Sequence, residues 1–168
     1  ISTGNTAATS AVGSGAVDVF GTLAMTGSLA SLSNGTLNLH PGAALIMNYA
    51  LNGGTDRLAD AANLALDGSS LLLTGIAGGT LTENVASLSI VRGSKIATAG
   101  GTVAFSAAGN LTRSGAATLT FAPTALALGT SGANGQRILV GGGTVITNGM
   151  LPAYIVNSTD NQYVTYGA

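Results

Sequence analysis

The side chains that could carry out acid–base or metal chemistry are few in this sequence and lie far apart. The 168 residues include six acidic side chains, one histidine and no cysteine. The acidic residues are Asp18, Asp56, Asp60, Asp67, Glu83 and Asp160. Hydrolysis of a glycosidic bond requires two carboxyl groups at a defined separation, and only Asp56 and Asp60 are close in sequence. The spacing therefore predicts no paired carboxylates for such chemistry.

The basic residues are also scattered, although one alignment would bring charges together. They are Arg57, Arg92, Lys95, Arg113 and Arg137. If stacked turns of the chain place Asp56, Glu83 and Arg113 in line, the three form a small charged cluster. We expect such a cluster to make corner hydrogen bonds, or an ion pair between turns that contributes about 0–1 kcal/mol when exposed. We therefore predict that the protein is not an enzyme and has no catalytic residues.

Metal and cofactor sites are not predicted either. His40 precedes Pro41 and Gly42 and follows an alternating apolar segment, which is typical of a turn residue. The glycine pairs lack the sequence context of phosphate-binding loops. The segment 53–56 approaches a calcium-binding solenoid repeat but does not recur with the necessary period. Because cysteine is absent, thiol chemistry and cysteine-ligated zinc or iron–sulfur sites are excluded.

The overall composition excludes further classes of partner. The formal net charge is -1, so there is no basic surface for a nucleic acid or an anionic membrane. No apolar run approaches the roughly 18 residues of a membrane-spanning helix. Charged residues make up 7% of the chain, so Ser, Thr, Asn and Gly must form most of its surface. The chain opens at Ile1 without a signal-peptide pattern, and we expect a processed chain or an excised segment.

The most informative pattern is a short alternation of apolar and other residues, repeated along almost the whole chain. Such alternation predicts very short strands with one buried face. The segments are Val17–Val19, Leu37–Leu39, Leu45–Met47, Leu64–Leu66, Leu71–Leu73, Leu88–Ile90, Val103–Phe105, Leu119–Phe121 and Ile138–Val140. Between them lie Gly, Asn and Asp residues, which tolerate the backbone angles of tight corners.

These segments recur with a period in the mid-twenties. Taking Leu37, Leu64, Leu88 and Leu119 as equivalent gives spacings of 27, 24 and 31 residues. A second series, Leu45, Leu71 and Ile96, gives 26 and 25. Repeats of this length indicate a solenoid, and we predict an all-β fold, a right-handed parallel β-helix with about six or seven turns. The longer spacing before Leu119 is expected to form a protruding loop. Residues 1–168 are expected to form a single β-solenoid segment of a longer or polymeric assembly.

Two structural alternatives remain open at this point. Residues 55–66 have a possible N-cap at Thr55 and good helix formers, so a short helix competes with the strand at Leu64. A β-sandwich also has frequent turn signals, although its strands are usually longer. A threonine ladder for ice binding is not favoured, because the Thr-x-Thr spacing at 118–120 does not recur in each turn.

The segment Thr55–Ile96 resembles the strand repeats of bacterial autotransporter passenger proteins and related surface proteins. The likeness comprises Asp56-Arg57-Leu58, Leu64-x-Leu66-x-Gly68, Leu71-x-Leu73-x-Gly75, Thr82-Glu83-x-Val85, Leu88-x-Ile90, Gly93 and Ile96. Leu111-Thr112-Arg113, Leu119-x-Phe121, Leu128-Gly129 and the ending through Tyr154, Tyr163 and Tyr166 extend it. The resemblance implies a β-helical stalk that is secreted or displayed at the cell surface.

We therefore expect a structural, non-catalytic extracellular solenoid of a bacterial adhesin, stalk or fibre. Its unpaired end strands would invite coaxial stacking with a second copy, and its surface could engage other surfaces or glycans. The alternative is a carbohydrate-binding or carbohydrate-cleaving β-helix. That function would need Asp56 and Glu83 in a groove, or the tyrosines as sugar-stacking platforms. The tyrosines are Tyr49, Tyr154, Tyr163 and Tyr166.

Overall fold

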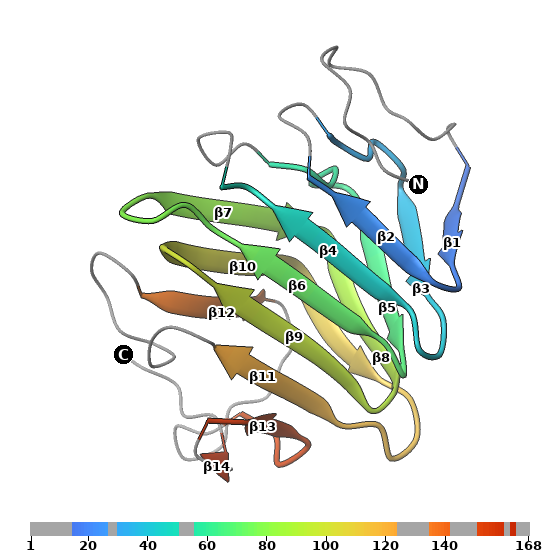
Figure 1. Cartoon of the computed structure of the whole chain (residues 1–168). Helices are drawn as coiled ribbons and strands as arrows, with labels where there is room; N and C mark the ends of the chain where they lie inside the picture. The colour runs from blue at the N-terminus through green and yellow to red at the C-terminus, as the bar shows by residue number, and fades with distance from the viewer. Residues whose placement is uncertain are drawn as a thin grey trace.

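The chain folds as a β-solenoid, or β-helix, whose parallel strands stack in about four turns (Figure 1). The computed structural model describes residues 15–26, 30–50, 56–123, 135–141, 151–159 and 162–163. Every regular element within these ranges is a strand. The all-β, solenoidal fold predicted from the sequence is therefore confirmed. The β-sandwich alternative is wrong, because neighbouring strands run parallel throughout except at β14.

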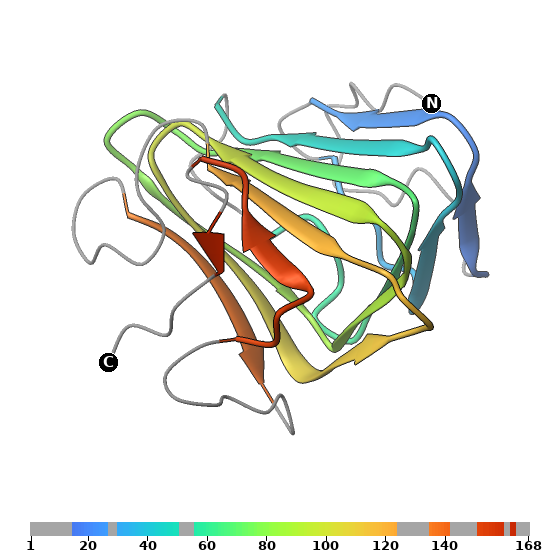
Figure 2. The ribbon, with the colours of Figure 1, turned by 90° about the horizontal axis from the view of Figure 1, so that it is seen from below.

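The strands form two ladders along the solenoid. Sheet I contains β1 (Val17–Val19), β3 (Thr36–Leu39), β5 (Asn63–Asp67), β8 (Ser87–Arg92) and the end of β10 (Thr102–Arg113). Sheet II contains β2 (Thr22–Met25), β4 (Ala44–Asn48), β6 (Ser70–Thr74), β9 (Ser94–Ala99), β11 (Leu119–Pro123), β13 (Ile155–Asn157) and β14 (Gln162–Tyr163). A third side contains β7 (Thr80–Val85), the start of β10 and β12 (Gln136–Gly141). Figure 2 shows these strands surrounding a common interior.

The pairing registers follow from the apolar alternation. All nine alternating segments predicted as strands lie within strands of the structure. Leu37 pairs with Leu64, which pairs with Leu88, so the predicted spacings of 27 and 24 residues are confirmed. In sheet II, Leu45 pairs with Leu71, which pairs with Ile96. In each case the inward residue stacks on the inward residue of the previous turn.

The equivalence predicted for Leu119 is wrong. Leu111, not Leu119, lies opposite Leu88, and Leu119 lies opposite Ser94 in sheet II. The residues before Leu119 do not form a protruding loop, because β10 is long enough to serve two sides of the solenoid. Its Thr102–Ala107 portion pairs with β7, and its end pairs with β8. The sequence pattern failed here because Arg113 occupies the position opposite Ile90, where a second apolar residue was expected.

The number of turns is smaller than the six or seven predicted. The mid-twenties period holds through β11 but widens to 33 residues between Val103 and Gln136 and to 36 between Leu119 and Ile155. The helix considered for residues 55–66 is absent from its described part. Residues 56–62 form no regular element apart from a bridge at Leu58, and β5 begins at Asn63. Thr55 lies outside the described residues.

The interior is a continuous stack of aliphatic side chains. Leu, Ile, Val and Met side chains from all three sides form one buried cluster. Leu66, Leu71, Ile96 and Leu119 have no exposed surface. Burial of each such side chain contributes about 1.5–3 kcal/mol relative to exposure, so stability accumulates turn by turn.

The corner at Gly101 requires glycine for two separate reasons. Its φ of +51° lies in the left-handed region, and a Cβ placed there would lie 2.0 Å from the carbonyl oxygen of Ile76. At Gly42 the φ is +76°, but a Cβ would meet no atom within 4 Å. A side chain at Gly42 would therefore be disfavoured by the backbone angle alone, whereas a side chain at Gly101 would also collide with the neighbouring backbone.

We predict that Gly101→Ala lowers the free energy of unfolding by clearly more than Gly42→Ala does. The Gly42 variant should lose about 1–2 kcal/mol from the left-handed conformation alone, whereas the Gly101 variant must also move a neighbouring backbone segment. Urea unfolding followed by far-UV circular dichroism measures both. Equal losses would show that the contact with Ile76 imposes no constraint.

Candidate functional site

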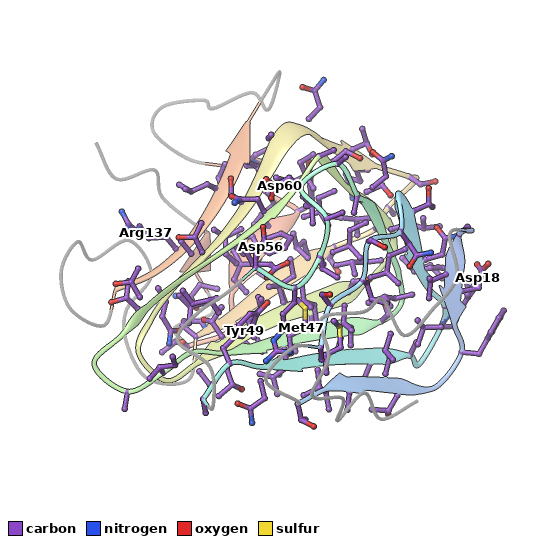
Figure 3. The ribbon with its side chains drawn as sticks, turned by 90° about the horizontal axis from the view of Figure 1, so that it is seen from above. Asp18, Met47, Tyr49, Asp56, Asp60 and Arg137 are labelled. Carbon is purple, nitrogen blue, oxygen red and sulfur yellow. The ribbon has the colours of Figure 1, made fainter. Side chains whose placement is uncertain are left out.

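Charged and hydroxyl side chains from two successive turns meet on the third side of the solenoid. This corner cluster consists of Tyr49, Asp56, Arg57 and Glu83. Tyr49 directly follows β4, Asp56 and Arg57 precede the bridge at Leu58, and Glu83 lies in β7. Figure 3 labels Tyr49 and Asp56 of this cluster. It is the only place in the described residues where pKa values of several groups shift together.

Glu83 occupies an inward position of β7 that is otherwise apolar. Its neighbours on the same face of the strand are Leu81 and Val85, and all three side chains have no exposed surface. The Glu83 carboxylate accepts hydrogen bonds from the backbone N–H of Arg57 at 3.0 Å and of Leu58 at 2.6 Å. The Tyr49 hydroxyl donates a further bond to Oε2. A buried carboxylate is tolerated here because three donors replace its water.

Arg57 completes the cluster from its other side. The residue is 1% exposed, and its guanidinium donates to the carbonyls of Ala30 and Asn48, each at 2.8 Å. The guanidinium carbon lies 4.6 Å from the centre of the Tyr49 ring, in a cation–π arrangement. Loss of hydration lowers the pKa of Arg57, and the neighbouring Tyr49 and Glu83 oppose that shift.

Asp56 lies at the solvent side of the same cluster. Loss of hydration, followed by hydrogen bonds with Glu83 and Asp60, raises the pKa of Asp56 to about 8. Burial also raises the pKa of Glu83, while its hydrogen bonds with Asp56 and Tyr49 act in the opposite direction. Asp56 and Glu83 therefore share a proton at neutral pH, with Asp56 as the donor. Burial raises the pKa of Tyr49 as well, so its hydroxyl stays protonated.

This geometry is suited to joining turns and not to hydrolysis. The two carboxyl groups are in direct hydrogen-bond contact, whereas glycoside hydrolases hold theirs at least about 5 Å apart. The fully buried Glu83 cannot reach a polysaccharide substrate. The cluster instead connects Ala30, Tyr49, Arg57 and Glu83 across three turns.

The alignment of charges considered from the sequence is present for two of the three residues. Asp56 and Glu83 meet, as expected for stacked turns, but Arg113 does not join them. Arg113 donates from Nε to the carbonyl of Ala117 at 2.6 Å and stacks over the Tyr154 ring at 4.5 Å. It projects from sheet I, whereas Glu83 lies on the third side.

Sequence reasoning missed the roles of Arg57 and Tyr49. The signal available for Glu83 was the period-two pattern Leu81-x-Glu83-x-Val85, which places a charge at an inward position. Tyr49 offered no comparable signal, because it follows its strand directly. Asp160 and Tyr166, and the side chain of Tyr163, lie outside the described residues.

Two further pairs of charged or titratable residues, Asp18 with His40 and Asp67 with Arg92, lie near the corners between sheets I and II. His40 is a turn residue, as predicted. Its Nε2 lies 2.8 Å from the Asp18 carboxylate, and its ring stacks on Phe20. Asp67 and Arg92 form a two-contact ion pair between adjacent turns, with separations of 2.6 and 3.1 Å. These two pairs, each of which links adjacent turns at a corner, were not predicted from the sequence.

Within the described ranges, no three His, Asp or Glu side chains are grouped in a way that could hold a metal ion. The same ranges contain no helix with the length and hydrophobicity needed to cross a bilayer. Comparisons with protein-family models, curated proteins and solved structures found no match. The resemblance to autotransporter passenger proteins therefore stays a prediction.

We predict that the free energy of unfolding falls as the pH rises from 3.8, the ordinary pKa of an aspartate, to about 8. A raised pKa means that the folded state holds the proton more tightly than the unfolded chain does, so stability is greatest in acid and is lost as Asp56 ionises. Asp56→Asn keeps a hydrogen-bond donor toward Glu83 and should flatten this slope. Urea unfolding at a series of pH values measures it.

The matched control for this experiment is Asp67→Asn, at another corner of the solenoid. It should keep the wild-type slope between these pH values. An Asp56→Asn variant with an unchanged slope would show that the shared proton does not contribute to stability.

We predict that Glu83→Ala destabilises the fold far more than Glu83→Gln. Removal of the carboxylate leaves the buried N–H groups of Arg57 and Leu58 without their acceptor and the guanidinium without its counter-charge, a loss of about 3–5 kcal/mol. Gln preserves an acceptor oxygen and most of the volume. Thermal and urea unfolding of both variants would decide this, and a smaller loss for Ala than for Gln would contradict it.

Proposed function

We propose that this chain is a non-catalytic structural β-solenoid of a bacterial extracellular surface protein, such as an adhesin, stalk or fibre. The observation that carries the proposal is the use of the interior. Aliphatic side chains fill it along the stack, and the buried charged groups bind other turns of the same chain. Such an arrangement produces length and rigidity from successive turns.

The surface chemistry supports a role outside the cell. Outward positions of sheet I hold Asn38, Ala65, Ser89 and Thr112 in one line. Three of these side chains are polar, and Ala65 is small. On the same face, the Ser87 hydroxyl donates a hydrogen bond of 2.6 Å to the Asn63 side chain of the previous turn. A surface with few charges and no cysteine resists changes of salt and oxidation, which suits exposure to variable surroundings.

The resemblance of residues 55–96 to autotransporter repeats is the second support. The residues behind it occupy equivalent places in successive turns: Leu64 with Leu88, and Leu71 with Ile96. The resemblance thus rests on positions that build the solenoid. Any solenoid with this period would share them, so the proposal of a surface location depends on the experiment below.

End-to-end assembly belongs to the same proposal. Sheet II and the third side differ in whether their last strand is free to pair with a further strand. β14 runs antiparallel to β13, so the parallel series of sheet II stops there. β12 pairs with β10 and with no other described strand. Its inward side chains Ile138 and Val140 are only partly buried. The third side, at β12, is therefore the edge on which we propose that a further turn or second copy would add.

Carbohydrate binding is the competing function. Tyr49 is fully buried and Tyr154 is half-buried beneath Arg113, so neither presents a free ring face. A glycan site would have to use other residues.

Cryo-electron microscopy of the purified chain over a concentration series tests the assembly. We expect separate rods at low concentration and coaxial filaments at high concentration, with a repeat near 4.8 Å along their axis, the spacing of stacked strands. Val140→Pro removes a backbone N–H donor at the β12 edge and should reduce the number of filaments. A proline substitution in a loop away from this edge should leave filament formation unchanged. Compact particles without the repeat would contradict the proposal.

Location and activity need separate measurements. Antibodies against the purified chain should label intact source cells without permeabilisation. Label that requires permeabilisation would overturn the extracellular assignment. A screen against polysaccharides should show no bond cleavage, and cleavage abolished by Asp56→Asn or Glu83→Gln would establish the competing function.

A further inference from the structure

The most deeply buried position of β12 is occupied by a polar side chain. Gln136 lies opposite Val103 of β10 and has no exposed surface. The apolar inward residues of the same strand, Ile138 and Val140, are only partly buried. Burial of apolar surface would favour the reverse order, with an aliphatic residue opposite Val103. A specific contact must therefore hold Gln136 in place.

That contact is a hydrogen bond between sheet II and the third side. The Thr98 hydroxyl of β9 donates to the carboxamide oxygen of Gln136, and both side chains are buried. Among the described residues, no acceptor lies within hydrogen-bond distance of the Gln136 Nε2. Part of a buried amide is thus left without a partner, which costs stability. Buried polar pairs of this kind are best known for fixing how two elements align.

The sequence of β12 also fits a second register on β10, the strand beside it in Figure 1. In this displaced register every residue of β12 moves by two positions, so Ile138 lies opposite Val103 and Val140 lies opposite Phe105. Because the side-chain period of a strand is two, such a shift keeps the same face inward. Gln136 then leaves the interior, and Ile138 takes its fully buried place.

The glycines at the end of β12 permit the same displacement. A Cβ at Gly141 would lie 2.3 Å from the carbonyl oxygen of Ala108, so this close approach requires a glycine. The sequence continues with Gly142 and Gly143, and a shift of two residues would again bring a glycine into line with Ala108. The long connection from Gly141 to Ile155 leaves enough chain for the shift.

We propose that the hydrogen bond between Thr98 and Gln136 selects the register of β12, and that β12 slides by two residues along β10 when this bond is absent. Both registers place two aliphatic side chains of β12 inward, and both supply a glycine beside Ala108. These features therefore do not distinguish the two registers. Only the observed register brings Gln136 within reach of the Thr98 hydroxyl.

The register of β12 determines which residues its free edge presents. Leu139, an exposed outward residue, lies opposite Ser106 in the observed register and would lie opposite Ala104 in the displaced one. A further turn or second copy that adds to this edge would therefore meet a different row of side chains in each register. The sliding itself takes place within one chain. It does not rest on the end-to-end assembly or the surface location proposed above.

Disulfide trapping within one chain measures the register, since the native chain has no cysteine. Leu139→Cys with Ser106→Cys reports the observed register, and Leu139→Cys with Ala104→Cys reports the displaced one. Directly opposed residues lie about 4.8 Å apart, within disulfide range, whereas a shift of two separates them by about 8 Å. At low protein concentration only the first pair should crosslink. Addition of Thr98→Val should remove that crosslink and produce the second.

Substitutions at Gln136 test the same point from the other partner. Gln136→Ala removes the bond and leaves space opposite Val103, so Ile138 should slide into it and the second crosslink should form. Gln136→Leu fills that space and should keep the first crosslink, even together with Thr98→Val. Thr120→Val, at a partly exposed outward position of β11, is the matched control and should leave both results unchanged.

Two results would overturn the proposal. Retention of the first crosslink alone in Thr98→Val or Gln136→Ala would show that the hydrogen bond does not select the register. Loss of both crosslinks in a chain that keeps its circular dichroism spectrum would show that β12 detaches and does not slide. Thermal unfolding establishes that each variant is folded before its crosslinks are compared. If Thr98→Val does not fold, the contrast between Gln136→Ala and Gln136→Leu decides the question.

Discussion

The requirement that each turn of the chain return onto the previous one, in register and about 4.8 Å away, governs this structure. It makes residues about 25 positions apart share one environment, so Leu64 stacks on Leu37 and Ile96 on Leu71. Because the side-chain period of a strand is two, a slip of one residue would turn the aliphatic stack outward. The corners absorb differences in length between turns, and their glycines lie where the backbone bends most sharply or passes closest to another corner.

The third side satisfies this requirement in a different way at its N-terminal end. Between residues 30 and 58 it has a single parallel bridge, Leu32 with Leu58, in place of a strand pair. The next turn supplies β7, but the N–H groups of Arg57 and Leu58 are bound by the Glu83 side chain and not by backbone carbonyls. The carboxylate thus substitutes for part of a β-ladder. This explains why a charge is retained at a position that an apolar residue would otherwise fill.

Period-two alternation was sufficient to predict the fold class, the nine strand segments and most registers, because a filled interior demands apolar residues at every inward position. The alternation failed to predict the structure where a charged residue stands at a position expected to be apolar. Arg113 lies opposite Ile90 and conceals the register of β10, and Glu83 interrupts the apolar pattern of β7. The meeting of Asp56 with Glu83 could be anticipated from the stacking of turns. The parts played by Tyr49 and Arg57 depend on the path of the chain between strands, which composition and spacing do not determine.

The replacement of backbone pairing by a carboxylate also affects how the solenoid would respond to a pulling force. In a rod pulled along its axis, sheets I and II oppose separation with rows of amide hydrogen bonds that do not titrate. On the third side, near residues 56–58, the same load passes through an acid pair that shares a proton. The resistance of this contact to separation therefore varies with pH. We therefore expect the strength of this one contact between turns to depend on the pH of the surroundings.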